Sequence, residues 1–407
     1  MTRTPSITNL VAFMVLATTS TAAAQVFATE VEGRVLDESM VETHGHPVTM
    51  DNTNILLFDQ PGGVPRVVPV HKGLTLVVGA ASYREQGSLN RRLARRSGDL
   101  DPIESPYLAT TNGQRIPGAI ATGADGRVSW RNAWLPNLEL DPETISEIRF
   151  IERAEVPTPS DADMVVLANG DRIEGLVESI GSVVSLEIVG GERDGDSVEI
   201  PIDRVAAVAL VNPPVEPKGT MVWYRGGHRI LGETLQIDDD GYTRVVRPDL
   251  GGDIAEVPTD YLMAASFDAG RIRPWASLDW RQSEGVVPGV RPWIPPIEQD
   301  PGHHPLDASP LRVHGAMRAT AEIPWRGAAF RVLVERAPDS GPGACFFVVR
   351  DGDQEIARRR IDPETPLAVI SGVVEGGRLV FEVEQGPDGP FEDDLVLREA
   401  LIMRSGD

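Results

Sequence analysis

The chain has 407 residues, with 61 acidic and 38 basic side chains, so its formal net charge is −23. A surface this acidic repels the phosphate backbone of nucleic acids, and we therefore expect no nucleic-acid partner. One cysteine, Cys345, stands in an apolar run, where it is predicted to be a small buried residue. Because one thiol cannot form a disulfide within the chain, the folded parts must depend on apolar cores.

Residues 1–24 have the features of a signal peptide. Arg3 precedes an apolar run at 10–17, and three alanines at 22–24 form a small-residue cleavage site before Gln25. The apolar run is shorter than the roughly 20 residues that a membrane-spanning helix needs. We therefore expect the segment to be removed, leaving an exported protein, periplasmic or extracellular, with no transmembrane segment.

Residues 25–104 are predicted to form a β-rich N-terminal segment. Two runs, 54–58 and 73–78, alternate apolar side chains with other residues, and Pro- and Gly-containing turns separate them. The segment has no motif that assigns it a role. An Arg-rich stretch at 91–96 could contact an anion, but an exposed turn is the interpretation we favour.

The middle of the chain contains one short pattern three times, at a spacing of 57 residues. The copies read NGQRIPG at 112–118, NGDRIEG at 169–175 and GGHRILG at 226–232. A fixed period indicates one small structural unit made three times. The predicted boundaries of the units are 105–155, 161–211 and 218–270.

Each unit is expected to hold about five short strands. Asn-Gly is suited to a hairpin turn, because its glycine takes a positive φ without strain. The last glycine of the pattern falls inside a strand-like run, where glycine marks a bulge or a sharp bend. Short strands with tight turns are typical of SH3-like barrels or of strongly bent sheets. The fold class predicted for the chain is therefore all-β.

The pattern also repeats an arginine, at Arg115, Arg172 and Arg229. Three guanidinium groups could bind anionic sugars or phosphate groups. The alternative is that each arginine packs its stem over the sheet and pairs with a neighbouring acid, and we favour this second interpretation.

Residues 271–407 are predicted to form a jelly-roll-like β-sandwich, preceded by a lead-in rich in Trp and Pro. The turns between its strand-like runs are rich in Gly, Pro and Asp, as in double-sheet folds. The strand-like runs are 330–335, 344–350, 367–374, 378–384 and 394–403.

This last part resembles the NPCBM/NEW2 domain, a carbohydrate-binding module found beside glycoside hydrolases of family 98. The resemblance is carried by SPLRVHG at 309–315, by FFVVRDGD at 346–353, and by GRLVFEVE at 377–384 with the acidic pair at 393–394. It covers about residues 305–405. It implies a β-sandwich and binding of carbohydrate as expectations for this chain.

Four tryptophans lie between Trp275 and Trp325, and an indole face stacks well on the C–H face of a sugar ring. We therefore predict Trp293, His314 and Trp325 as carbohydrate-binding residues. The alternative is that the tryptophans anchor the connection between two domains.

No catalytic residue is predicted. The acidic groups at 238–240, 351–353 and 392–394 lie beside glycines in turns, where Asp is favoured for backbone reasons. We expect no cofactor; calcium is the one metal that such loops would suit, because it binds oxygen ligands crowded in a loop.

The sequence therefore predicts an exported, non-enzymatic protein with a carbohydrate-binding C-terminal module. Its partner would be a carbohydrate or another component of the cell envelope. Two alternatives stay open: a structural or protein-interaction role in the envelope, and a divergent glycoside hydrolase or its accessory protein. The sequence does not predict the oligomeric state.

Overall fold

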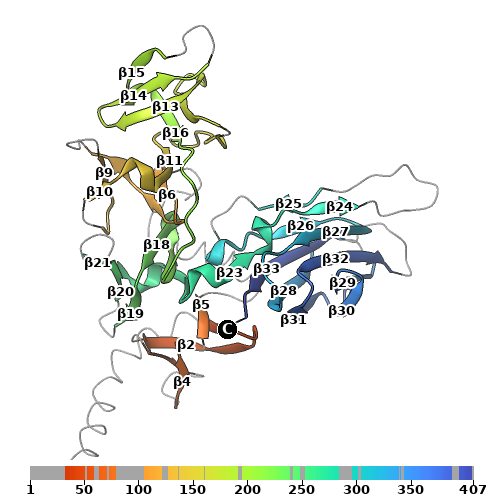
Figure 1. Ribbon diagram of the computed structural model, residues 1–407. Coiled ribbons are helices and arrows are strands. Elements are labelled where there is room, and N and C mark those ends of the chain that lie inside the picture. Colours follow the sequence, from red (N-terminus) through yellow and green to blue (C-terminus); the bar gives the residue numbers. More distant parts are fainter. Residues whose placement is uncertain are drawn as a thin grey trace, which may run out of the picture. The chain divides into compact units, whose positions relative to one another are not determined.

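The computed structural model of the protein is almost entirely β-structure, with a few single turns of 3₁₀ helix, so the all-β prediction is confirmed (Figure 1). The described residues form two compact units, one ending at Phe267 and the other comprising Leu36–Glu42 and the chain from Asp268 onward. In the described part of the chain, no helix has the length and apolar character needed to cross a membrane. The structure describes residues 33–50, 53–58, 64–70, 73–78, 105–121, 127–135, 137–159, 161–190, 195–238, 242–247, 253–283, 296–300, 304–338, 340, 343–386 and 394–405.

The described part of the N-terminal segment contains five strands. The two predicted strands are confirmed, as β3 and β5, and β2, β3 and β4 form an antiparallel meander. The signal peptide and the Arg-rich stretch at 91–96 lie outside the described residues. The strands are β1 (Gly33–Asp37), β2 (Glu42–Met50), β3 (Asn54–Phe58), β4 (Pro65–Pro69) and β5 (Gly73–Val78).

The second repeat shows the design of all three most clearly. Its strands pair in the antiparallel order β16-β12-β13-β14-β15, so the last strand returns to lie beside the first. A single 3₁₀ turn, Ile202–Arg204, precedes the last strand. Of the two architectures considered, the paired strands form the bent sheet. The strands are β12 (Asp163–Leu167), β13 (Arg172–Ile180), β14 (Val183–Ile188), β15 (Ser197–Pro201) and β16 (Val205–Ala209).

The first and third repeats follow the same plan, with a 3₁₀ turn before a last strand that pairs with the first. The first repeat contains β6 (Tyr107–Thr110), β7 (Arg115–Pro117), β8 (Ala119–Ile120), β9 (Val128–Arg131), β10 (Leu138–Leu140) and β11 (Ile145–Arg149). The third contains β17 (Thr220–Tyr224), β18 (His228–Gly232), β19 (Thr234–Ile237), β20 (Tyr242–Arg247), β21 (Asp253–Pro258) and β22 (Leu262–Ser266).

The two glycines of the repeated pattern have different tasks. The turn glycine takes a left-handed conformation, with φ of 85° at Gly113 and 91° at Gly170. The strand glycine allows a close crossing, because a Cβ on Gly175 would overlap the carbonyl oxygen of Glu187 on β14. A Cβ on Gly232 would likewise lie 2.7 Å from the carbonyl oxygen of Val246. The glycine therefore permits a close approach of two backbones. The register shift of β13 against β14 lies further on, between Val177 and Ser179, so a bulge or bend at the glycine itself stays a prediction.

A shared apolar column closes each repeat. Ile145, Val205 and Leu262, at the start of the last strands, are all buried in the core of the first unit. The repeats are also joined strand to strand. Edge strand β11 of the first repeat pairs with β16 of the second, and β7 of the first pairs with β18 of the third.

The second unit is a β-sandwich, as predicted, made of two antiparallel sheets. One has the order β25-β26-β33-β28-β31 with β23 beside β33, and the other has the order β24-β27-β32-β29-β30. Between the sheets lies an aromatic core of Trp275, Phe330, Phe347 and Phe381. Cys345 is buried there, as expected.

The five predicted strands of the sandwich are present with ends shifted by at most two residues, and further strands complete the sheets. The strands of the second unit are β23 (Ile272–Pro274), β24 (Arg281–Ser283), β25 (Glu298–Gln299), β26 (Leu311–Val313), β27 (Met317–Glu322), β28 (Ala328–Arg336), β29 (Cys345–Asp351), β30 (Gln354–Ile361), β31 (Leu367–Val374), β32 (Arg378–Gln385) and β33 (Leu395–Met403).

Candidate functional site

His314, one of the three predicted binding residues, lies just after β26 between acidic side chains. Its Nδ1 is 2.9 Å from Asp394 Oδ1, and its Nε2 is 3.7 Å from Glu298 Oε1. Arg312 donates to the other oxygen of Asp394, at 3.1 Å. These contacts fix the plane of the imidazole ring, and they give His314 a structural role whether or not it contacts a ligand.

Trp325 lies in the turn between β27 and β28, where it packs partly buried against the sandwich core. The guanidinium carbons of Arg273 and Arg404 lie 5.5 and 5.9 Å from its ring centroid, within the range of a cation–π contact. The charged partners of Trp325, Arg273 and Arg404, differ from those of His314, Asp394 and Glu298. Trp293 lies outside the described residues, so the carbohydrate-binding role of all three stays a prediction.

Two of the other clustered tryptophans belong to the core of the sandwich itself. Trp275 is fully buried and stacks on Phe381 with a centroid distance of 6.1 Å, and Trp280 meets the same ring edge-on at 4.9 Å. Trp280 also donates its indole N–H to the carbonyl oxygen of Trp275 at 2.8 Å. Their clustering in the sequence therefore has a packing explanation.

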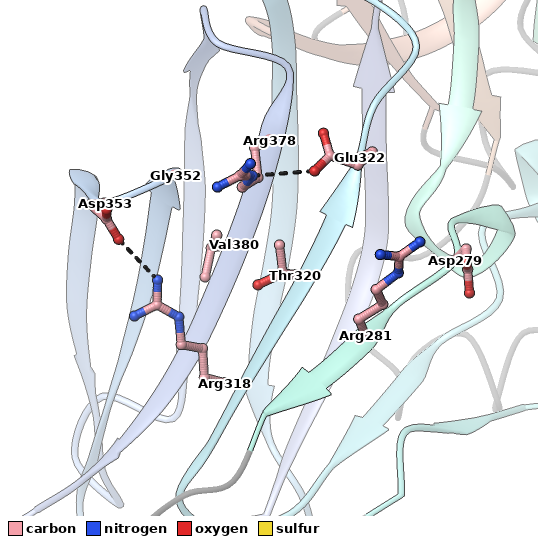
Figure 2. A pocket seen from close by; sticks show the side chains of 9 residues that line it. All are labelled: Asp279, Arg281, Arg318, Thr320, Glu322, Gly352, Asp353, Arg378 and Val380. Carbon is pink, nitrogen blue, oxygen red and sulfur yellow. Dashed lines mark hydrogen bonds and ion pairs between the residues drawn. The ribbon is translucent and has the colours of Figure 1, made fainter.

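The outer face of the sheet that contains β24, β27 and β32 holds a shallow hollow of about 320 Å³ (Figure 2). Strand alternation places it there: along β27, Met317, Ala319 and Ala321 point into the core. The intervening side chains therefore face outward. The hollow is lined by Asp279, Arg281, Arg318, Thr320, Glu322, Gly352, Asp353, Arg378 and Val380.

Ion pairs hold two of the three guanidinium groups at the hollow. Arg378 donates to Glu322 at 3.2 Å, and Arg318 lies 3.4 Å from Asp353 (Figure 2). Arg318 also lies 2.9 Å from Glu382. The Arg378–Glu322 and Arg318–Asp353 pairs are at the surface, where each is worth about 0–1 kcal/mol, so a polar ligand can displace them at little cost. Glu382 is only 12% exposed, so its pair with Arg318 is not of this exposed kind. The three cations and three carboxylates of the lining balance each other.

Such a surface suits a neutral, hydroxyl-rich ligand. A guanidinium offers several N–H donors in one plane, and a carboxylate offers only acceptors, so neighbouring pairs present both. Thr320 adds a hydroxyl between them. The sequence singles out Gly352 and Asp353 only within the acidic turn at 351–353 and the motif at 346–353, and Arg378 and Val380 only within the motif at 377–384. None of the lining residues was predicted to bind a ligand, because alternating Arg and Glu on an exposed strand is an ordinary surface pattern. Their convergence depends on pairing between strands far apart in the chain.

In the arginine column of the repeats, Arg172 fits the interpretation we favoured, because it pairs with an acid, while Arg115 contacts an aromatic ring. Arg172 pairs with Glu155 at 3.2 Å, and the Arg115 guanidinium lies 4.0 Å from the centroid of the Tyr107 ring. Burial lowers the pKa of Arg115 and raises that of Tyr107, whose hydroxyl donates to Glu147 at 2.7 Å. Arg229 is the register partner of Arg115 across β7 and β18.

Of the acidic turns, the one at 351–353 has a backbone role at its first residue. Asp351 Oδ2 accepts hydrogen bonds from the N–H groups of Glu375 and Gly376, at 2.9 and 2.7 Å. Within the described ranges, no three His, Cys, Asp or Glu side chains converge in a way that could hold a metal ion. Residues 239–240 and 392–393 lie outside those ranges.

His304 gives the second unit a pH dependence. Burial holds the pKa of His304 below its usual value, and the nearby positive charge of Arg398 acts in the same direction. The folded state therefore favours the neutral ring. The contribution of the neutral His304 ring to the free energy of unfolding is present above about pH 6.5, the pKa of histidine in the unfolded chain. It is lost as the pH falls below that value. Urea unfolding at a series of pH values should show this loss, and His304→Asn should flatten it; an unchanged slope in the variant would contradict the assignment.

No protein-family model and no curated protein matches this chain. Among solved structures it is similar to a CBM51 module with INT domains of Clostridium perfringens ZmpB in complex with GlcNAc, at 10% identity and a TM-score of 0.27, over 45% of this chain and 43% of that one. It is also similar to CBM51 of C. perfringens GH95 in complex with methyl-galactose, at 12% identity and a TM-score of 0.25, over 32% and 99% of the chains.

A third similar structure is the pair of tandem CBM51 modules of Sp3GH98, the family 98 glycoside hydrolase of Streptococcus pneumoniae. The identity is 12% and the TM-score 0.27, over 74% of this chain and 88% of that one. The chain covers less than half the length of the ZmpB structure. TM-scores below 0.5 assign neither a family nor a ligand, so the function is inferred below from this chain's own residues.

Proposed function

We propose that this is an exported, non-enzymatic protein that binds carbohydrate in the hollow on the outer face of its β-sandwich. The observation that carries the proposal is the balanced set of guanidinium and carboxylate groups around that hollow. All three guanidinium groups and Glu322 are on the adjacent strands β24, β27 and β32 of one sheet, so the backbone holds them at fixed spacing, while Asp279 and Asp353 lie in the connections beside these strands. The NPCBM-like motifs at 309–315 and 377–384 point to the same class of ligand.

Sugar rings carry hydroxyl groups that both donate and accept hydrogen bonds at regular intervals. The paired side chains Arg378–Glu322 and Arg318–Asp353 offer donors and acceptors on two sides of Thr320. A hollow of about 320 Å³ is at the small end of ligand sites, which fits one or two rings at the end of a glycan.

The exposure of the lining carboxylates supports a binding role over a catalytic one. Asp353 is fully exposed and Glu322 largely so. A glycosidase needs one carboxyl with a raised pKa, which comes from an apolar or enclosed environment. Asp279, the third lining carboxylate, is exposed as well, so none of the three has that environment. A divergent hydrolase would instead require acids outside the hollow.

A glycan array probed with the chain lacking residues 1–24 tests the proposal, followed by calorimetric titration of the strongest glycan. Arg318→Ala and Arg378→Ala should each weaken binding about tenfold, the value of one hydrogen bond to a charged group. Arg326→Ala, an exposed arginine outside the hollow, is the matched control and should bind normally. Absence of binding to any glycan, or full binding by both variants, would refute the proposal.

The residues predicted from the sequence define a competing site on the same module. Trp325→Ala and Trp293→Ala would abolish binding if an indole platform holds the sugar, and His314→Ala would weaken it. If these variants lose affinity while the hollow variants keep it, the ligand lies at the predicted residues instead.

A structural role in the envelope is the second candidate function. It is favoured by the strand pairing between repeats, which makes one extended β-assembly from three units. A specific protein partner from envelope extract, captured without dependence on sugar, would support this role.

A further inference from the structure

The repeats are joined through equivalent strand edges. Arg115 on β7 and Arg229 on β18 are register partners, and both are the arginine of the repeated pattern. Because the two strands are antiparallel, a local two-fold relation connects the first and third repeats at this point. The pattern's arginine lies on the second strand of each repeat, which is β7, β13 or β18. One side of this strand pairs with the first strand of the same repeat, and we call its other side the motif edge.

The last strands are used in the same way. Ile148 on β11 pairs with Val208 on β16, again at equivalent positions of two repeats. The last strand of the third repeat, β22, pairs with β5 of the N-terminal segment. Each repeat thus has a motif edge and a last-strand edge. Among the described strands, five of these six edges have a strand partner.

The sixth is the motif edge of the second repeat, at Arg172 and Ile173 of β13. On one side Arg172 pairs with Val166 of β12, and on the other β14 begins to pair only at Gly175. The Glu174 carbonyl accepts from the Val189 N–H on this side, and no described strand pairs there with Arg172 or Ile173. An uncovered edge offers backbone N–H and C=O groups to a further strand.

Exposed apolar side chains lie beside this edge. Leu176 is 57% exposed and Val189 is 52% exposed. Alternation along β13 places the side chains of Arg172, Glu174 and Leu176 on one face of the sheet. Val189, just after β14, lies opposite Glu174, and its N–H donates to the Glu174 carbonyl oxygen at 3.3 Å. Apolar groups next to an open edge are typical of a surface that a partner covers.

The charges at this edge permit self-pairing. Two arginines directly opposite each other across strands repel. Arg172, however, brings its own carboxylate, Glu155, at 3.2 Å. Where the first and third repeats pair, the carboxylate of Glu147 likewise offsets part of the positive charge of Arg115. The second repeat therefore carries the same compensation for a pair of arginines.

We propose that the motif edge of the second repeat binds a second copy of this chain. The two β13 strands would pair antiparallel about Arg172, repeating between molecules the contact that β7 and β18 make within one. Such a contact is isologous and closes as a dimer, so it does not propagate into fibres.

Cross-linking of the full chain without residues 1–24 tests the geometry. A two-fold strand pair brings the residue 172 Cα atoms of the two copies to roughly 4.5–5.5 Å, within the range of a disulfide. Arg172→Cys should therefore form a covalent dimer rapidly under mild oxidation. Asp203→Cys, exposed on the same repeat, should not, and the native Cys345 is buried and should stay inert.

Analytical ultracentrifugation of the chain without added cysteines supplies the second readout. The native protein should show a monomer–dimer equilibrium, and Leu176→Glu should weaken it at least about tenfold. Val215→Glu, at a site 55% exposed, is the control and should leave it unchanged. A native chain that stays monomeric would overturn the proposal, as would cross-linking of Arg172→Cys that is no faster than that of Asp203→Cys.

Discussion

Gly175→Ala is expected to destabilise the first unit by about 3 kcal/mol, at the upper end of the usual cost of overpacking. The new Cβ would overlap the carbonyl oxygen of Glu187 and lie 2.9 Å from Leu186 Cδ1. The carbonyl belongs to the backbone of β14, which cannot move without breaking its pairing with β13 and β15. For a unit of roughly 200 residues, such a loss lowers Tm by about 6–12 °C in differential scanning calorimetry.

Gly181→Ala is the matched control, because nothing lies within 4 Å of its Cβ position. It lies in the turn between β13 and β14, at the end of the strand that contains Gly175. Its Tm should be unchanged or slightly higher, since alanine restricts the unfolded chain. If the two variants melt at the same temperature, the repeated glycine is not a steric requirement of the bend.

Arg331→Met is expected to destabilise the second unit by about 3–5 kcal/mol, the usual effect of breaking a buried ion pair. The side chain is 2% exposed, on β28, and donates to Glu42 at 2.8 Å and to Glu399 at 3.1 Å. Methionine keeps most of the volume but leaves two carboxylates close together without their cation. Urea denaturation followed by tryptophan fluorescence measures the change.

The comparison variant is Arg378→Met, which breaks an ion pair with Glu322 at the surface. Because both side chains are largely exposed, its effect on stability should stay below about 1 kcal/mol. Equal losses in the two variants would show that burial does not set the value of the Arg331 pairs. Since Glu42 lies far from the other residues of this unit in the sequence, fragments starting near residue 270 lack one partner of Arg331.

The repeats were the part of the fold most open to prediction. A fixed spacing of 57 residues aligned Gly118, Gly175 and Gly232, and each lies where a Cβ would overlap the backbone of a neighbouring strand. The apolar column at Ile145, Val205 and Leu262 marked the start of each last strand. Because the unit occurs three times, each position of it could be read in three sequences. A turn or strand pattern that is weak in one copy could therefore be checked against the other two. The domain boundaries drawn from these signals stay a prediction.

Strand β30 shows why single-copy segments were harder. Its sequence, QEIARRRI, has three consecutive arginines and no alternation of apolar residues. It is nevertheless a strand at the edge of its sheet. The ion pairs of Arg358 with Glu384 on β32 and with Glu355 on β30 itself stabilise this conformation. These partners come from tertiary structure, which overrides local strand preference.

The candidate site could not be predicted for a related reason. Sequence reasoning favoured tryptophans, but Trp275 and Trp280 are needed in the core, where they contact Phe381. The side chains of the hollow come from β24, β27 and β32, whose pairing brings Arg281 opposite Thr320 and Thr320 opposite Val380. No spacing along the chain encodes that convergence.

Hydrogen–deuterium exchange of the full chain, with and without the strongest glycan from the array, tests the central claim most directly. Bound sugar should slow exchange in Met317–Glu322 and Arg378–Gln385, the strands that carry the hollow. Segments of the three repeats should exchange as before. Protection confined to residues 304–314 or to the turn at Trp325, or no protection in the sandwich at all, would contradict the claim that this hollow binds carbohydrate.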